Sequence, residues 1–447
     1  MNQTHTARRP AVPDSEYHPK AKAAVRAGVL AYFVDQFDIY LPIIALAPAS
    51  AYFQSTDIST SAAALLNAFV FASTLIARPI GAMIFGHFAD TRSRHKSTLV
   101  AVAGFGVTTA LIAVLPGYET IGIASVVLLI ALRFVDGIFL GGEYTTAVPL
   151  AMEWSPRNRR GLVSGSITCT SPAAYAVVAA ITLVLLSVMP SADVDSAYVQ
   201  WGWRIPFAIG ALLAVVLFLA YRREVEEPNT ERTTQGGSPL AQLVKGEHRR
   251  SMIQIFVLMT GTWLACNAGL AVLPGLLSSH VGLTNTEVTV TMMVATAVTA
   301  VTYPLFGILS QRIGRRPFYI GYGIAVVVGA PAYALAMNRD NGLGMTMVIC
   351  SVVTVFTIGT FAPIAAYLTE RFPASIRASG YGVGHSLALI IPAFYAFYLD
   401  GLAGFMPDYY APVVLVVLAG ALISVGALAG PETKDVDMGP QTTDTVT

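Results

Sequence analysis

The sequence predicts an all-α polytopic membrane protein whose twelve transmembrane helices form two pseudo-symmetric six-helix bundles. Three observations lead to this fold class. Hydrophobic residues make up 55% of the 447 residues, charged residues only 12%, and the mean hydropathy is +0.63, whereas soluble domains carry about 25% charged residues. The chain is also divided into apolar segments of spanning length. Finally, several sequence patterns recur at a separation close to half of the chain.

Each apolar segment is close to the ~20 residues that a helix needs to cross a bilayer. Six segments lie in each half of the chain. They are residues 24–53, 61–85, 97–117, 121–152, 161–189, 203–221, 252–278, 287–310, 317–337, 343–369, 377–399 and 409–429.

Two recurring patterns predict that the halves are homologous. The first is a block in which an apolar segment ends in charge; it contains Gly86, Asp90 and Arg94 in one half and Gly307, Arg312, Gly314, Arg315 and Arg316 in the other. The second pattern, Glu-x-x-Pro-x-x-x-Arg, runs from Glu153 to Arg160 and again from Glu370 to Arg377. Their separations, 221 and 217 residues, are nearly equal. Patterns of different chemistry that keep one spacing indicate a duplicated architecture.

Positive charge predicts the orientation in the membrane. Of the 27 Lys and Arg residues, 23 fall in the tails and loops on the side of the N-terminus. Because cytoplasmic segments retain Lys and Arg, both termini are expected in the cytoplasm. The expected divisions are a tail (1–23), an N-terminal bundle (24–221), a linker (222–250) with a short helix near 239–246, a C-terminal bundle (251–430), and a disordered tail (431–447).

The patterns resemble those of a known transporter family. The charged blocks are similar to the loop signature G-x-x-x-D-R-x-G-R-R/K of the major facilitator superfamily, and the twelve-helix plan is similar throughout. Further motifs resemble its metabolite:proton symporter branch: Asp35-Gln-Phe-Asp38, Arg78-Pro-Ile-Gly81, Arg133-Phe-Val-Asp-Gly137, Gly141-Gly-Glu-Tyr144 and Trp203-Arg-Ile-Pro-Phe207. The resemblance implies a carrier that imports organic acids or zwitterionic osmolytes with protons. It implies no enzyme activity and no cofactor.

The loop signature also departs from the family pattern. Thr91 and Ser93 stand where the family has Arg and Gly, and Gln311 stands where the second copy would have Asp. In the family this loop is thought to latch the cytoplasmic helix ends. Asp90 is therefore expected to meet a cation or a helix terminus, and the first copy is expected to be the stronger latch. The alternative is that both blocks serve only to set topology.

Six ionisable side chains lie deep in predicted helices of the first half: Asp35, Asp38, Arg78, Arg133, Asp136 and Glu143. A buried charge in a membrane costs about 2.5 kcal/mol or more unless it is paired or hydrated. With a rise of ~1.5 Å per residue, Asp35 and Arg133 reach similar depths near the midplane. An ion pair between the first helix and Arg133 is therefore predicted, with Asp35 favoured over Asp38 as the titrating acid.

This pair suggests a coupling mechanism. Protonation of the acid would free Arg133 to hold a substrate carboxylate through two parallel hydrogen bonds. The other expected substrate-binding residues are Arg78, Tyr144, Asn267, Tyr303 and His385. Each of these residues has a structural alternative. Arg133, Asn267 and Tyr303 could tie helices together, and Arg78 could neutralise Asp90 or a helix end. His385 could be a satisfied interior histidine, Asp136 and Glu143 could pair within the first half, and Glu143 could mark a packing turn.

Small residues and prolines predict where helices approach and bend. Gly137 and Gly141 permit close helix contact, and Pro172 and Pro392 would kink the fifth and eleventh helices at equivalent positions. Such a carrier would alternate access between the two sides.

The function predicted from these features is proton-coupled symport of a small organic anion across the cell membrane. Two alternatives stay open: uptake of a zwitterionic osmolyte with protons, and export of hydrophobic compounds. A membrane enzyme would need a nucleophile, metal or phosphate constellation, and the scattered histidines and three cysteines form none. The expected partners are the substrate, protons and lipid, with no metal and no nucleic acid, and a monomer is expected to suffice.

Overall fold

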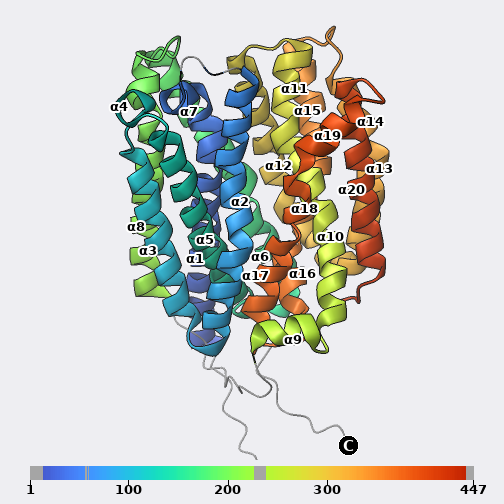
Figure 1. Cartoon of the computed structure of the whole chain (residues 1–447). Coiled ribbons are helices and arrows are strands. Elements are labelled where there is room, and N and C mark those ends of the chain that lie inside the picture. Colours follow the sequence, from blue (N-terminus) through green and yellow to red (C-terminus); the bar gives the residue numbers. More distant parts are fainter. Residues whose placement is uncertain (1–13, 56–57, 59, 226–237, 439–447) are drawn as a thin grey trace, which may run out of the picture.

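The computed structural model describes residues 14–55, 58, 60–225 and 238–438, and within these ranges the fold is entirely helical. The helices form two bundles that stand side by side, the N-terminal half on one side and the C-terminal half on the other (Figure 1). In the described part of the chain, eleven helices are long and apolar enough to cross a membrane. The predicted all-α, polytopic fold class is thereby confirmed.

Six of these spans build the N-terminal half. They are formed by α1 (Asp14–Tyr40), α2 (Thr60–Thr91), α3 (Arg94–Ala113), α5 (Ala124–Glu153), α6 (Arg160–Thr168) with α7 (Thr170–Val188), and α8 (Arg204–Glu224), with the short α4 (Tyr118–Ile121) before α5.

Five spans and one broken helix build the C-terminal half. The spans are formed by α10 (Arg249–Asn267) with α11 (Leu273–Leu276), α12 (Asn285–Ile313), α15 (Leu343–Ile358) with α16 (Ile364–Glu370), α17 (Arg377–Leu387) with α18 (Ile390–Ala393) and α19 (Tyr395–Ala403), and α20 (Ala411–Leu428). Helix α9 (Pro239–Lys245) precedes them, where the sequence predicted a short helix in the linker.

The predicted segment 317–337 differs from the other eleven. It is divided into α13 (Arg315–Gly329) and α14 (Pro331–Ala336) and is not among the eleven spans. Pro331 explains the break because proline lacks the N–H that would continue the helix. Both pieces still pack against α20, so this segment fills the twelfth place in the bundle.

Irregular turns lie within several spans or at their ends. π-Helical turns follow α1 (Leu41–Ala45) and α10 (Ala268–Val272), which are the first helices of the two halves. The helices predicted to bend at Pro172 and Pro392 are indeed divided, between α6 and α7 and between α17 and α18. The remaining irregular turns are Ala47–Phe53, Arg157–Arg159, Tyr198–Gly202, Leu277–Val281, Gly359–Phe361 and Asp408–Tyr410.

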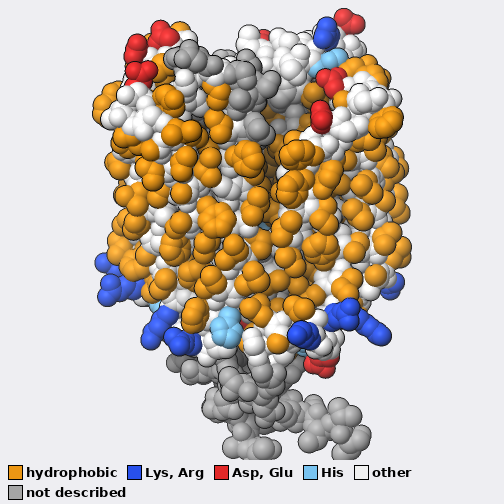
Figure 2. Space-filling view, viewed as in Figure 1, with side chains coloured by type: hydrophobic (Ala, Val, Ile, Leu, Met, Phe, Trp, Pro, Cys, Tyr) orange, Lys and Arg blue, Asp and Glu red, His pale blue; other side chains and the backbone are white. Residues whose placement is uncertain are grey.

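The surface shows how the molecule meets a membrane. A broad hydrophobic belt surrounds the helices, with Lys and Arg gathered at one end and Asp and Glu at the other (Figure 2). The first end, here called the basic end, exposes Arg92, Arg159, Arg222, Lys245 and Arg316. The opposite or acidic end exposes Glu119, Asp193, Asp195, Asp400 and Asp408. This is the surface of a multi-pass membrane protein.

The two halves touch along α17, which packs on α2 and α5, and along α12, which packs on α6 and α7. Within the N-terminal half, α2 and α5 make the closest approach. A Cβ atom on Gly137 would overlap the carbonyl oxygen of Thr74, and one on Gly141 would overlap that of Arg78. The predicted glycine contact is therefore present, and it places Arg78 directly against α5.

Replacing Gly141 by alanine should destabilise the protein by about 1–3 kcal/mol, because a methyl group has no space beside the Arg78 carbonyl. The melting temperature of the purified protein in detergent should fall by several degrees. Gly321→Ala is the matched control, since a Cβ there meets open space on the exposed side of α13. An equal effect of both substitutions would contradict the packing described here.

Candidate functional site

The first polar cluster surrounds Arg133 of α5. Its Nη1 lies 2.5 Å from Oδ1 of Asp38 on α1 and 2.9 Å from Oδ2 of Asp136 one turn along α5. From α3, Thr108 donates to Oδ1 of Asp136 (2.8 Å) and Thr109 donates to Asp38. All of these side chains are buried. Arg133 therefore ties α1, α3 and α5 together.

The second polar cluster surrounds Arg78 of α2. Its Nη2 donates to both carboxylate oxygens of Asp35, at 3.2 and 3.1 Å. Gln36 donates to Oδ2 of Asp35 at 2.7 Å. The guanidinium carbon lies 4.6 Å from the centre of the Tyr144 ring, which is the geometry of a cation–π contact.

The predicted ion pair between the first helix and Arg133 is present, but Asp38 forms it rather than Asp35. Three residues along a helix rotate a side chain by roughly 60°, so the two acids of α1 face different neighbours. Asp38 points to α5, and Asp35 points to α2 and Arg78. The rotation of α1 about its axis could not be predicted from spacing alone. The predicted partner for Asp136 within the first half is confirmed as Arg133.

Several buried polar atoms around Tyr144 have no hydrogen-bond partner among the residues that the structure describes. They are Nε and Nη1 of Arg78, both carboxyl oxygens of Glu143, the hydroxyl of Tyr381, and both ring nitrogens of His385. The Tyr144 ring centre lies 4.9 Å from that of His385 and 6.2 Å from that of Tyr381. The predicted pairing of Glu143 within the first half is thus not seen, and His385 is not a satisfied interior histidine.

This group of unpaired atoms lies where the two halves meet, because α2 and α5 belong to the first half and α17 to the second. Buried polar groups in proteins are nearly always hydrogen-bonded. A cluster of donors and acceptors without partners therefore marks the place where a polar ligand would supply them. The cluster contains one ion pair, Arg78 with Asp35. Because Nε and Nη1 of Arg78 are positively charged donors without an acceptor among the described residues, an anionic group would suit them as a ligand.

A cavity of ≈250 Å³ lies between the halves on the acidic side of this cluster. Pro42, Leu46, Tyr175, Leu270 and Tyr395 are among its lining residues, and Pro42 and Leu46 follow Asp35 along the chain toward the acidic end.

Hydrogen bonds connect the cavity wall to Asp35. The ring of Tyr40 lies 5.1 Å from that of Tyr175, Tyr40 and Ser171 share a hydrogen bond of 2.9 Å, and Ser171 donates to Gln36 at 2.7 Å. Gln36 in turn binds Asp35. The buried acid is therefore linked by side chains to the cavity.

The basic end is closed by the first charged block. Asp90 at the end of α2 accepts hydrogen bonds from the backbone N–H groups of Ala378 (3.1 Å) and Ser379 (2.8 Å) in the first turn of α17. This is the helix-terminus partner predicted for Asp90. Gly86 allows the contact because α17 passes directly over it at Ser379.

An ion network lies beside this latch. Glu153 of α5 pairs with Arg94 and accepts from Arg377 of α17 at 2.6 Å, and Arg94 donates to the carbonyl of Ala374 at 2.9 Å. Glu153 and Arg377 come from different halves, so the network joins them. Two residues that the sequence singled out as members of separate repeats thus contact each other.

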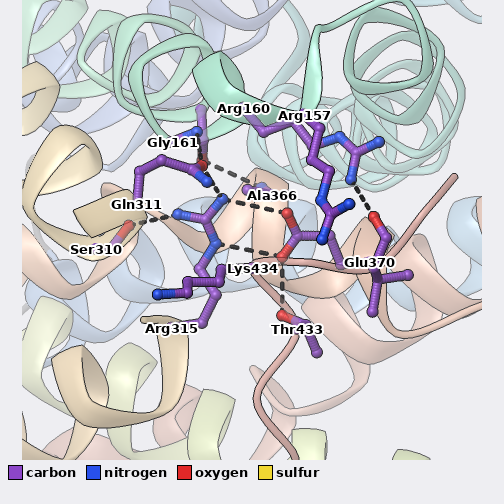
Figure 3. A network of polar contacts seen from close by, with 12 residues as sticks. Arg157, Arg160, Gly161, Ser310, Gln311, Arg315, Ala366, Glu370, Thr433 and Lys434 are labelled. Atoms are coloured by element: carbon purple, nitrogen blue, oxygen red, sulfur yellow. Dashed lines mark hydrogen bonds and ion pairs between the residues drawn. The ribbon is translucent and has the colours of Figure 1, made fainter. Parts of the chain in front are cut away.

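The second charged block forms a matching network (Figure 3). Arg315 pairs with Glu370 at 3.1 Å, and Gln311 accepts from Arg315 (2.7 Å) and from the backbone of Gly161 (2.9 Å). The amide of Gln311 therefore links the halves without supplying charge. Gly161 and Gly307 lie in backbone contact, where a Cβ on either would overlap the other's carbonyl oxygen.

The chain after α20 completes this closure. Thr433 donates to Glu370 at 2.8 Å, Arg160 of the first half donates to the carbonyl of Val436 at 2.6 Å, and Arg157 pairs with Asp435 at 3.1 Å. Residues 431–438 therefore pack across both halves, and the prediction of disorder from Pro431 was wrong for them. The remaining tail, 439–447, lies outside the described residues.

Other predicted site residues have different surroundings. Asn267 donates to the carbonyl of Pro392 (2.8 Å) and Tyr303 to that of Ile358 (2.7 Å), so both tie helices of the second half. Arg312 and Arg316 are exposed at the basic end, and Gly314 adopts a φ of +108° where α13 begins. Sequence reasoning missed Tyr381, although it lies between Gly380 and Gly382, where small neighbours leave a large side chain room to contact another helix.

Comparisons with known proteins give consistent results. Residues 28–396 match the Major Facilitator Superfamily. The alpha-ketoglutarate permease of Escherichia coli (strain K12) is 31% identical over 366 residues, covering 79% of this chain and 81% of the permease. The proline/betaine transporter of that strain is 26% identical over 420 residues (89% and 82%), and its shikimate transporter 27% over 358 residues (78% and 80%). In fold, the chain is similar to the proton:xylose symporter XylE bound to 6-bromo-6-deoxy-D-glucose, with a TM-score of 0.72, 16% identity, and coverage of 96% of this chain and 99% of XylE.

Replacing Glu153 by glutamine should loosen the closure of the basic end, because breaking a buried ion network costs about 3–5 kcal/mol. Ser379→Cys, in a background whose native cysteines are serine, would report the opening through its rate of maleimide labelling from the basic side. We expect labelling at least tenfold faster with Glu153→Gln. The control is Glu224→Gln, which removes the exposed pair with Arg26 (3.3 Å) and should leave the rate unchanged. Equal rates in both variants would show that the network does not hold this end closed.

Proposed function

We propose that this chain, which belongs to the Major Facilitator Superfamily and is a secondary transporter related to metabolite:proton symporters, carries a small organic anion together with protons. The family is one of transporters, not of enzymes. The observation that carries the proposal is the state of Arg78. Its Nη2 holds Asp35, while Nε and Nη1 are buried with no acceptor in the described part of the chain.

A carboxylate that displaces Asp35 from Nη2 suits this guanidinium group. Nη2 forms a fork with Nε on one side and with Nη1 on the other, and each fork matches the two oxygens of a carboxylate, while arginine stays charged throughout. Arg133 offers less, because its Nη1 is held by both Asp38 and Asp136. We therefore assign the primary anion contact to Arg78, with Tyr144, Tyr381 and His385 around it, and a coupling role to Arg133 and Asp38.

Proton coupling follows from the two guanidinium–carboxylate pairs. A substrate carboxylate that approaches Arg78 competes with Asp35, so binding the anion favours protonation of Asp35, and protonation favours binding. Hydrogen bonds from Tyr40 through Ser171 and Gln36 connect the cavity wall to the Asp35 side chain, which supports access to this acid from the cavity. Such mutual dependence is the thermodynamic basis of symport.

The closed basic end and the cavity beyond the cluster support alternating access from the acidic end. We propose that the basic end, with both termini, lies in the cytoplasm, because Lys and Arg gather there (Figure 2). Substrate would then enter from outside the cell at the acidic end. It would leave when the two networks at the basic end separate.

A zwitterionic osmolyte is the second candidate, and one observation favours it. The rings of Trp263 and Phe361 lie 5.2 and 6.2 Å from that of His385 and 4.8 Å from each other. Aromatic faces attract quaternary ammonium groups. A betaine could place its carboxylate on Arg78 and its cation toward these rings.

Uptake into proteoliposomes tests the function. With the lumen at higher pH than the medium, we expect the purified protein to accumulate at least one of a panel of mono-, di- and tricarboxylates, aromatic acids and betaines. A protonophore should abolish that accumulation. Accumulation of a betaine and of no acid would select the second candidate. Transport that ignores the pH gradient would contradict proton coupling.

Arg78→Lys tests the substrate contact. Lysine keeps the charge but loses the planar fork, so the Km for the transported anion should rise by about tenfold or more, equivalent to ~1.4 kcal/mol of lost binding. The matched control is Arg223→Lys, at an exposed position near the end of α8, which should leave Km unchanged. An Arg78→Lys variant with the Km of the parent protein would rule out the bidentate contact.

A further inference from the structure

We infer that Glu143 is a second proton-carrying residue of the transport cycle, an inference that rests on the proposed symport of an anion. In the conformation described here Glu143 is a neutral carboxylic acid. When the basic end opens and the anion leaves, it releases its proton there and takes the anion's place on Arg78. The sequence suggested only a packing or pairing role for this residue.

The surroundings of Glu143 favour the neutral form. Its side chain is fully buried in α5, and neither carboxyl oxygen receives a hydrogen bond from any described residue. An ionised carboxylate in such a place would lose its hydration without gaining a donor, which costs far more than burying a neutral acid. The other buried acids of this half differ, because Asp35, Asp38, Asp90 and Asp136 each contact a guanidinium group.

Asp35 on α1, Arg78 on α2 and Tyr381 on α17 are the ionisable groups whose charge acts on the Glu143 carboxyl group. The same two helices of the first half also carry Tyr32, Asp38, His87 and Asp90. The remaining titratable or charged residues of the neighbouring helices α3, α6, α16 and α17 lie toward the basic end or across the cluster: Arg94, His95, Lys96, Arg160, Tyr367, Glu370, Arg377 and His385. Arg78 is thus the cation available to an ionised Glu143.

The balance of charge supports this assignment. Two guanidinium groups, Arg78 and Arg133, face four buried carboxyl groups, so each cation has two acids within its surroundings. Arg133 contacts both of its acids, at 2.5 and 2.9 Å. Arg78 contacts only Asp35, and its Nε and Nη1 are unused while Glu143 is unpaired. Arg78 therefore has donors without an acceptor among the described residues, and Glu143 is the acid that could accept from them when it is ionised.

The position of Glu143 along α5 decides when water reaches it. Glu143 is ten residues from Glu153 in the closure of the basic end, or about 15 Å along the helix. Water that enters when this end opens would therefore reach Glu143 before it reaches Asp38 and Arg133, which lie farther toward the acidic end.

Each step conserves protons and charge. On the acidic side, a proton from water binds the Glu143 carboxylate, which separates from Arg78, and the anion takes the freed guanidinium nitrogens. After the basic end opens, the anion leaves and the Glu143 O–H bond breaks, with its proton passing to water on that side. The carboxylate then pairs with Arg78 in the place that the anion left, beside Asp35, for the return of the empty carrier. One proton crosses through Glu143 in each cycle.

Glu143→Gln tests the inference, because glutamine imitates the neutral acid but cannot release a proton. The number of protons moved with each anion is measured in proteoliposomes from the substrate gradient at which net flux stops under a set pH difference and membrane potential. We expect this number to fall by one in Glu143→Gln and to keep its normal value in Glu143→Asp. Glu119→Gln, at an exposed acid of the acidic end, is the control. An unchanged proton number in Glu143→Gln overturns the inference.

A second measurement does not require transport. In the infrared spectrum of the purified protein at neutral pH, the C=O band of a buried carboxylic acid should be present and should weaken in Glu143→Gln but not in Glu119→Gln. If Glu143→Gln leaves this band unchanged, Glu143 is not a neutral acid and the inference fails. Failure of the parent protein to accumulate any anion would instead contradict the proposed function.

Discussion

The N-terminal half depends on the burial of two guanidinium groups in a region that water cannot reach. A charge placed in a membrane must be paired, and each arginine here is paired with an acid of the first helix, Arg78 with Asp35 and Arg133 with Asp38. These pairs fix the rotation of α1 against α2 and α5. They also explain why glycines line the contact of α2 with α5, since Arg78 can face the centre only if the two backbones meet closely.

In the proposed mechanism, the same pairs make the protein responsive to ligands. A hydrogen-bonded ion pair stabilises one arrangement of helices only while both partners keep their charge. A bound anion competes with the carboxylate for the arginine, and a proton removes the charge of the carboxylate, so either one weakens the ion pair. The second half contributes mostly aromatic and neutral groups at this depth, such as Tyr381 and His385. The N-terminal half therefore supplies the charged groups of the cluster, and the C-terminal half supplies a neutral aromatic surface.

Much of the fold could be predicted because a membrane imposes simple rules on length and polarity. Apolar runs located the spans, and the repeated blocks located the two halves. The break at Pro331 was missed because the apolar run continues through it. For the site, spacing along the chain identified the residues that form the ion pairs. It did not give the rotation of α1 about its axis, so Asp35 was assigned to Arg133 rather than to Arg78. The unpaired state of Glu143 depends on what surrounds it in three dimensions, and neighbouring glycines in the sequence carry no information about that.

The segment that follows α20 gives the carrier a mechanical dependence on its own chain end. Glu432 accepts hydrogen bonds from the backbone N–H groups of Arg315 and Arg316, and four residues later Val436 is held by Arg160 of the other half. In the proposed transport cycle, opening of the basic end breaks these contacts and closing restores them. The energy needed for opening is therefore set partly by residues 431–438, outside the binding site.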